Sequence, residues 1–151
     1  MSSAYLLPTL SSKREVDDVI KSTEDLVLVL RFGRENDSSC IQLDNVLSKA
    51  VQELARMAVV YAVDVDQVSV YRHYFDITLI PATIFFFNGQ HMKVDWGTAD
   101  HTKFIGGFKK KQHLIDVVET IYRGAMKGKL MVRSPLDPSD IPKYELFYKD
   151  Y

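Results

Sequence analysis

Residues 26–54 read LVLVLRFGRENDSSCIQLDNVLSKAVQEL, and this stretch decides the fold. Its first seven residues, 26–32, form an apolar run interrupted only by Arg31, which is typical of a strand buried on both faces of a sheet. From Cys40 onward the apolar residues recur at helical spacing and form one stripe. Between the two stand Asp37, Ser38 and Ser39, all of which cap helices well. The stretch predicts a buried strand followed closely by an amphipathic helix.

The alternation of strand and helix continues outward from this unit. Further strands are expected at 59–65, 83–87 and 92–96, with a short one near Leu6. Further helices are expected after Ser12, at 68–75 and at 111–123. Asn88-Gly89 is a strong hairpin signal between the last two long strands. The order αβαβαββα predicts an α/β fold in which a mixed sheet is covered by helices on both faces.

The length of 151 residues fits one domain with a C-terminal extension. We expect the domain to cover residues 1–123 and the extension to cover 124–151. Residues 130–132 are apolar enough to add an edge strand to the sheet. Beyond them, prolines break helix formation while apolar residues such as Tyr144 and Phe147 offer surface for docking. Docking on the chain's own domain and docking on a partner are both open.

Composition excludes several classes of site. One cysteine cannot form an internal disulfide or a multi-cysteine zinc site, and the four histidines show no ligand spacing. No phosphate-binding loop or Ser-His-Asp constellation is present. We therefore expect neither metal nor cofactor. Without a signal peptide or a membrane-spanning run, the chain is expected to stay in the reducing cytosol or nucleus.

Charge is unevenly distributed along the chain. Residues 103–133 hold eight Lys or Arg against two Asp or Glu, a charge of +6, although the whole chain carries −1. Arg123 and Lys127 lie at the end of the last predicted helix, where the helix dipole favours cations. The dipole does not explain Lys109 to Lys111 at the start of that helix. These three lysines are therefore the better candidates for a solvated or partner-facing patch.

Several motifs support a more specific interpretation. The positions of Phe32, Cys40, Asp66, Pro81 and Asn88-Gly89 are similar to the landmarks of a thioredoxin fold. Longer motifs resemble the Dim family of spliceosomal thioredoxin-like proteins; they are Arg31-Phe-Gly33, Phe85-Phe-Phe-Asn-Gly-Gln-His-Met92, Asp100-His-Thr-Lys103 and Tyr122-Arg-Gly-Ala-Met-Lys-Gly128. The tail motif Ile141-Pro-Lys-Tyr144 is similar to the Dim-like branch of that family.

This resemblance implies a thioredoxin-like fold and a nuclear role in pre-mRNA splicing. It implies a non-catalytic protein–protein interaction module that contacts tri-snRNP proteins, with a link to cell-cycle progression. A homodimer is one of the assemblies to test. The fold resemblance also implies a cis bond before Pro81, which shapes the substrate groove in the enzymes and here holds a loop.

The redox chemistry of thioredoxins is missing from this chain. Asp37 stands at the place of the first cysteine, and Cys40 takes the second position within the apolar stripe. Ala82 stands where some Dim proteins have a further cysteine, so no disulfide can form with Cys40. We expect Cys40 to be a buried structural thiol and the protein not to be an enzyme. The alternative is a monothiol redox enzyme or thiol sensor that acts through Cys40.

Two further expectations concern charged residues. Arg31 in the buried strand needs a carboxylate partner, for which Asp64 and Asp66 are the candidates; the alternative is that Arg31 anchors a partner protein. Direct RNA contact is not expected, because the chain is near-neutral and lacks an RNA-recognition motif. The expected structural residues are Pro81, Arg31 and Cys40. The expected partner-binding residues are Lys109, Lys110, Lys111, Arg123, Lys127, Lys129, Tyr144 and Phe147.

Overall fold

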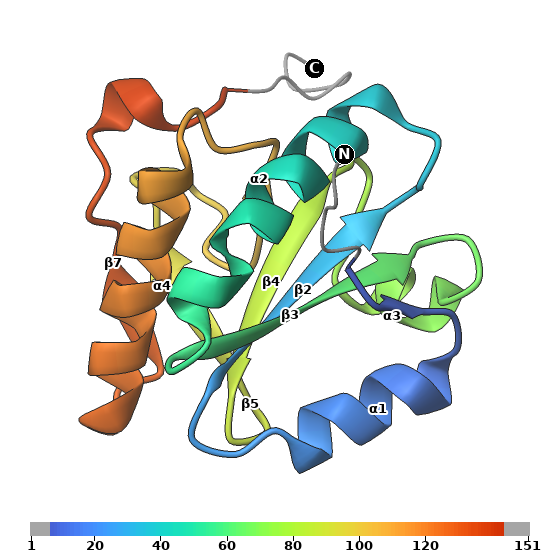
Figure 1. The fold of residues 1–151 in the computed structure, drawn as a ribbon, viewed down its shortest axis with the longest axis horizontal. Coiled ribbons are helices and arrows are strands. Elements are labelled where there is room, and N and C mark those ends of the chain that lie inside the picture. Colours follow the sequence, from blue (N-terminus) through green and yellow to red (C-terminus); the bar gives the residue numbers. More distant parts are fainter. Residues whose placement is uncertain (1–6, 144–151) are drawn as a thin grey trace.

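The strand β2 (Val27–Gly33) lies in the middle of the sheet, and all seven of its residues are buried. The computed structural model describes residues 7–143 (Figure 1). The other strands are β1 (Thr9–Leu10), β3 (Ala58–Asp64), β4 (Ala82–Phe87), β5 (Gln90–Asp95), β6 (Phe104–Ile105) and β7 (Met131–Arg133). The helices are α1 (Lys13–Ser22), α2 (Ser38–Leu54), α3 (Ser69–Tyr74), α4 (Lys111–Met126) and the 3-10 turn η1 (Pro138–Asp140).

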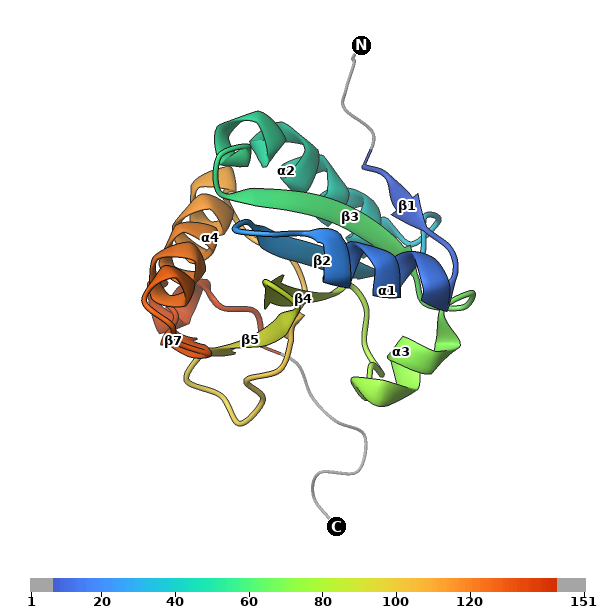
Figure 2. The same ribbon diagram turned by 90° about the horizontal axis from the view of Figure 1, so that it is seen from below.

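The sheet is mixed, as the sequence predicted. Its strand order is β1-β3-β2-β4-β5-β7, and β6 pairs with β4. β2 runs parallel to β3 and antiparallel to β4. Helices α2 and α4 lie on one side of the sheet, and α1 and α3 lie on the other (Figure 2). The predicted α/β architecture with helices on both faces is confirmed.

Two hydrophobic cores result from the alternation of side chains along β2. Val27 and Val29 point into the core beneath α2 and α4. Leu28, Leu30 and Phe32 point into the core beneath α1 and α3. Because successive strand residues face opposite sides, a strand buried on both faces must be apolar throughout. This is why the run 26–32 carries so strong a signal and why Arg31 within it is unusual.

The hairpin between β4 and β5 forms at the predicted Asn88-Gly89 turn. Both residues have positive φ, 51° for Asn88 and 81° for Gly89. Two such residues form the tight turn whose twist matches the flanking strands, and asparagine and glycine tolerate it best. The Asn88 side chain also accepts a hydrogen bond from the N–H of Asp25 at 2.6 Å.

The end of the domain differs from the prediction. Helix α4 continues past Arg123 to Met126, and the chain then turns through Gly128 at φ 84°. A boundary at residue 123 therefore cuts the helix. The predicted edge strand is present as β7, which pairs in parallel with β5. Leu136 and Ile141 pack against the core beneath α2 and α4, so the described part of the extension docks on its own domain.

Candidate functional site

The start of α2 is the place that a redox pair would occupy in this fold. Asp37 is the N-cap residue, and its carboxylate accepts a hydrogen bond from the N–H of Cys40 at 3.0 Å. This satisfies one of the backbone donors that every helix start leaves unpaired. The same backbone hydrogen bond stabilises the ionised carboxylate and holds the pKa of Asp37 below its ordinary value. A negative charge therefore stands where thiol chemistry needs a nucleophile.

Cys40 lies at the first buried position of α2. Its side chain is fully buried and packs over Gly33, where an added Cβ would overlap its Sγ. Burial raises the pKa of the thiol to about 11, and the Asp37 side chain adds to this effect. Because the thiolate is the reactive form, this burial and the raised pKa both disfavour reaction of Cys40 at neutral pH.

Arg31 is paired with Asp44 on α2. Arg31 Nε and Nη2 donate to the two carboxylate oxygens of Asp44 at 2.7 and 2.6 Å. The Arg31 side chain is 4% exposed and that of Asp44 is 27% exposed, so the pair closes the edge of the core. Asp44 lies one helical turn after Cys40, on the face that the apolar stripe turns toward β2. The same stripe therefore brings both residues to the strand.

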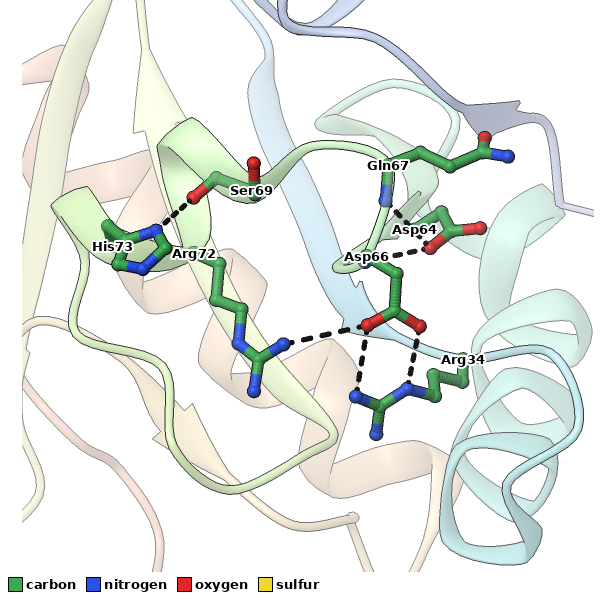
Figure 3. A network of polar contacts seen from close by, with 7 residues as sticks. All are labelled: Arg34, Asp64, Asp66, Gln67, Ser69, Arg72 and His73. Atoms are coloured by element: carbon green, nitrogen blue, oxygen red, sulfur yellow. Dashed lines mark hydrogen bonds and ion pairs between the residues drawn. The ribbon is translucent and has the colours of Figure 1, made fainter.

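The prediction that Asp64 or Asp66 neutralises Arg31 is wrong. The Asp64 carboxylate accepts hydrogen bonds from the N–H groups of Asp66 and Gln67 at 2.9 and 3.2 Å, which shapes the turn after β3. The Asp66 carboxylate accepts from Arg34 Nε and Nη2 at 2.8 and 3.0 Å (Figure 3). These bonds lower the pKa of Asp66. The network joins the loop after β2 to the loop after β3 (Figure 3), whereas the guanidinium of Arg31 is bonded to Asp44.

The loop before β4 contains the expected cis bond between Ile80 and Pro81. The Pro81 carbonyl accepts a hydrogen bond from the N–H of Gly106 at 2.9 Å. Gly106 in turn lies under Pro142 of the extension, because an added Cβ would come within 3.1 Å of the proline ring. The extension therefore lies against a residue that is hydrogen-bonded to Pro81.

The three lysines at the start of α4 do not form a free patch. Lys109 Nζ donates to the carbonyl of Ser139 at 3.0 Å and to Asp140 Oδ1 at 3.3 Å, which ties the extension to the helix start. Lys111 forms an ion pair with Glu53 on α2. Among the described residues, only Lys110 of the three has no carboxylate partner; it is the N-cap residue of α4. Two of the three predicted partner-facing charges are thus engaged within the chain.

The basic residues at the other end of α4 come together around an open groove. Arg123, Lys127 and Lys129 line it, and β7 adds Arg133. The groove has a volume of about 560 Å³ and also contains Asp95 of β5. Arg123 forms an ion pair with Glu119 yet stays 73% exposed. Within residues 7–143, Lys127, Lys129 and Arg133 have no carboxylate within ion-pair distance, so three unneutralised cations lie around this groove.

Sequence reasoning missed two contributors to these sites. Asp44 reads as an ordinary polar position of α2, and only its spacing from Cys40 signals that it faces β2. Asp95 enters the groove because β7 pairs beside the end of β5, a pairing that no local pattern reveals. Two predicted partner-binding residues, Tyr144 and Phe147, lie outside the described residues.

Two other kinds of site are missing from the part of the chain that the structure describes. Residues 7–143 contain no group of three or more His, Cys, Asp or Glu side chains placed to hold a metal ion. None of the helices in this range has the length and apolar character needed to cross a bilayer.

Comparison with known proteins identifies the relatives of this arrangement. The family described as "Mitosis protein DIM1" matches residues 6–138. Thioredoxin-like protein 4B of Homo sapiens is 63% identical over 147 residues, which cover 97% of this chain and 99% of the relative. The chain belongs to the Dim1 family. A further member of similar length, spliceosomal protein DIB1 of Saccharomyces cerevisiae, is 37% identical over 134 residues, 89% of this chain and 94% of that protein.

The Dim1-family fold is thioredoxin-like. The solved structure of Plasmodium falciparum thioredoxin matches with a TM-score of 0.59 over 75% of this chain and 97% of that one. The two sequences are only 20% identical, so this likeness describes the fold alone. The predicted thioredoxin-like fold and Dim-family membership are both confirmed.

Proposed function

We propose that this Dim1-family member is a non-catalytic protein–protein interaction module of pre-mRNA splicing with a role in cell-cycle progression. The names of its relatives support this proposal. The yeast relative is named a spliceosomal protein, and the matching family is described as a mitosis protein. We propose a nuclear location, because splicing takes place there. Its partners are proteins of the splicing machinery, and we propose that they belong to the tri-snRNP.

The observation that carries the non-catalytic assignment is the hydrogen bond from the Cys40 N–H to the Asp37 carboxylate. Asp37 uses the helix start to stabilise its own charge, where a redox enzyme would use it to stabilise a thiolate. The residue that remains, Cys40, is buried and has a thiol pKa of about 11. The family fold is thus retained as a scaffold, and its function lies on its surface.

A monothiol enzyme or thiol sensor is the competing function. It requires an accessible sulfur with a lowered pKa. The packing of Cys40 over Gly33 disfavours access to the sulfur. The pKa of the thiol is raised, where this function needs it lowered. Rapid alkylation of the native protein at neutral pH would revive this alternative.

The surface that we assign to partners centres on Arg123, Lys127 and Lys129. Lys110 and the C-terminal residues Tyr144 and Phe147 are further candidates. Lys109 and Lys111 are weaker candidates, because they form ion pairs within the chain with Asp140 and Glu53. We retain homodimer formation as a property to measure by sedimentation, and we expect protein contacts rather than RNA contacts to dominate.

Affinity purification from nuclease-treated nuclear extract tests the proposed function. Wild-type protein should recover tri-snRNP proteins without RNA, and so should Cys40→Ser. Charge reversal at Arg123 and Lys127 should reduce recovery, whereas Lys21→Glu on the exposed side of α1 serves as the matched control. Recovery of no splicing protein by the wild type would contradict the proposal. Loss of recovery on Cys40→Ser, with the fold intact, would favour the thiol alternative.

A further inference from the structure

Within residues 7–143, no strand pairs with the outer edge of β7. The strand order ends at β7, which pairs with β5 on its inner side. The N–H of Lys93 donates to the carbonyl of Leu130 at 2.9 Å, and the N–H of Ser134 donates to the carbonyl of Asp95 at 2.9 Å. In a parallel ladder, every second residue of a strand directs its N–H and C=O groups toward the same neighbouring strand. The N–H and C=O groups of Met131 and Arg133 therefore point away from β5.

A free strand edge of this kind pairs readily with another extended chain. The surface around it also carries exposed apolar side chains. Met126, Leu130 and Met131 are 58, 51 and 41% exposed, although each is a large hydrophobic side chain. They lie at the end of α4 and the start of β7, next to the groove that Arg123 and Lys127 line. Backbone groups, apolar side chains and cations are thus offered by one continuous surface.

Positive charge decides what this surface accepts. Arg123, Lys127, Lys129 and Arg133 line the groove, and Asp95 is the one carboxylate among its described lining residues. Arg123 also pairs with Glu119 on α4 but stays 73% exposed, so its guanidinium remains accessible. A second copy of the chain would bring four more cations to the same edge, and like charges across a strand pair are unfavourable. A partner strand with acidic side chains would instead be complementary.

We infer that the β7 edge and its basic groove bind an extended, acidic segment of a partner protein by strand addition. The partner segment pairs its backbone with Met131 and Arg133, and its carboxylates meet the four cations of the groove. Alternate apolar side chains of the segment contact the exposed Met126 and Leu130. This inference rests on the proposed interaction function and names the chemistry of the partner.

A nucleic acid fits this surface less well than a peptide. The described lining residues of the groove include no aromatic side chain on which a base could stack. A phosphate backbone also has no N–H groups to pair with a strand edge. Peptide recognition by strand addition uses both the backbone groups and the alternating side chains.

Binding to a synthetic peptide tests the inference directly. The probe is a fluorescein-labelled EVEVEVE peptide, with KVKVKVK as the charge control and a short oligouridylate as the nucleic-acid control. Fluorescence anisotropy with the purified full chain should detect binding of EVEVEVE and not of KVKVKVK. Amide NMR shifts should be largest at residues 131–133. N-methylation of every backbone amide of EVEVEVE, which removes all pairing donors while the charge stays, should abolish binding.

Variants of the protein complete the test. Arg123→Glu with Lys127→Glu should weaken EVEVEVE binding about tenfold or more, while Lys21→Glu on α1 should leave it unchanged. Failure of EVEVEVE to bind, equal binding of the N-methylated peptide, or preferential binding of oligouridylate would each overturn the inference. Because the assay uses purified components, its failure alongside recovery of splicing proteins from extract would reject this surface and leave the proposed function standing.

Discussion

The guanidinium of Arg31 and the carboxylate of Asp44 form a two-bond ion pair, at 2.7 and 2.6 Å, across the interface between the central strand and α2. The Arg31 side chain is only 4% exposed, so the Asp44 carboxylate, and not water, compensates its positive charge. Removing one partner of a buried pair leaves the other charged and unpaired, which costs more than losing both.

We predict that Asp44→Ala destabilises the fold more than the double change Arg31→Met with Asp44→Leu. Asp44 is partly exposed, so the single change should lower the free energy of unfolding by about 2–3 kcal/mol, below the range for fully buried pairs. The double variant should recover most of that loss. Urea unfolding measures both values, and equal losses in the two variants would show that the pair contributes little.

Alkaline pH should destabilise the protein through Cys40. The unfolded thiol loses its proton near pH 8.5, whereas the folded thiol has a pKa of about 11. The contribution is fully present below the unfolded pKa and is lost as pH rises toward the folded pKa, by roughly 1 kcal/mol per pH unit. Cys40→Ala removes this dependence. The measurement is the difference in unfolding free energy between wild type and Cys40→Ala from pH 7 to 11; a constant difference would contradict the prediction.

Replacing the cap of α2 should have a pH-dependent effect. Asp37→Ala should lower stability by about 1 kcal/mol at neutral pH because the Cys40 N–H loses its acceptor. The pKa of Asp37 is lowered in the folded protein, so its contribution is present above the unfolded pKa and is lost as pH falls through the folded pKa. The gap between wild type and Asp37→Ala in thermal unfolding should therefore shrink in acid. Ser38→Ala is the matched control.

The Lys109–Asp140 ion pair should hold the extension in place. Lys109→Glu sets two carboxylates opposite each other and should speed amide hydrogen exchange around η1, with a global cost of only about 0.5 kcal/mol because the pair is exposed. The swapped pair, Lys109→Glu with Asp140→Lys, should restore slow exchange. If Lys109→Glu weakens partner recovery and the swap restores it, Lys109 acts through the extension; if the swap does not, the charge itself meets the partner.

Much of the fold could be predicted from local patterns. The run 26–32, the stripe after Cys40 and the Asn88-Gly89 turn each depend on nearby residues, and each forms as expected. The burial of Cys40 also follows from its place in the stripe. The end of α4 is harder to predict, because glycine at position 124 lowers the local helix propensity. The structure shows why a glycine fits there: an added Cβ would overlap the Val132 side chain.

The candidate site depended on contacts between distant segments. The sequence shows that Arg31 needs a carboxylate, yet the choice of Asp44 follows from how α2 crosses β2. Composition likewise finds the basic segment, whereas the structure decides that Lys109 and Lys111 are neutralised and that Arg133 joins Arg123. Ion pairing is a tertiary property, so a count of charges along the chain overstates the free charge.

The pairing of β7 with β5 has a consequence for biosynthesis. Every other strand of the main sheet is translated before α4, and the strand that covers β5 follows it. A nascent chain that has already folded through α4 therefore exposes the edge of β5 until residues 131–133 leave the ribosome. Exposed edges are where growing chains associate wrongly. A stop codon just after α4 would leave the edge of β5 permanently unpaired, although most of the core would be present.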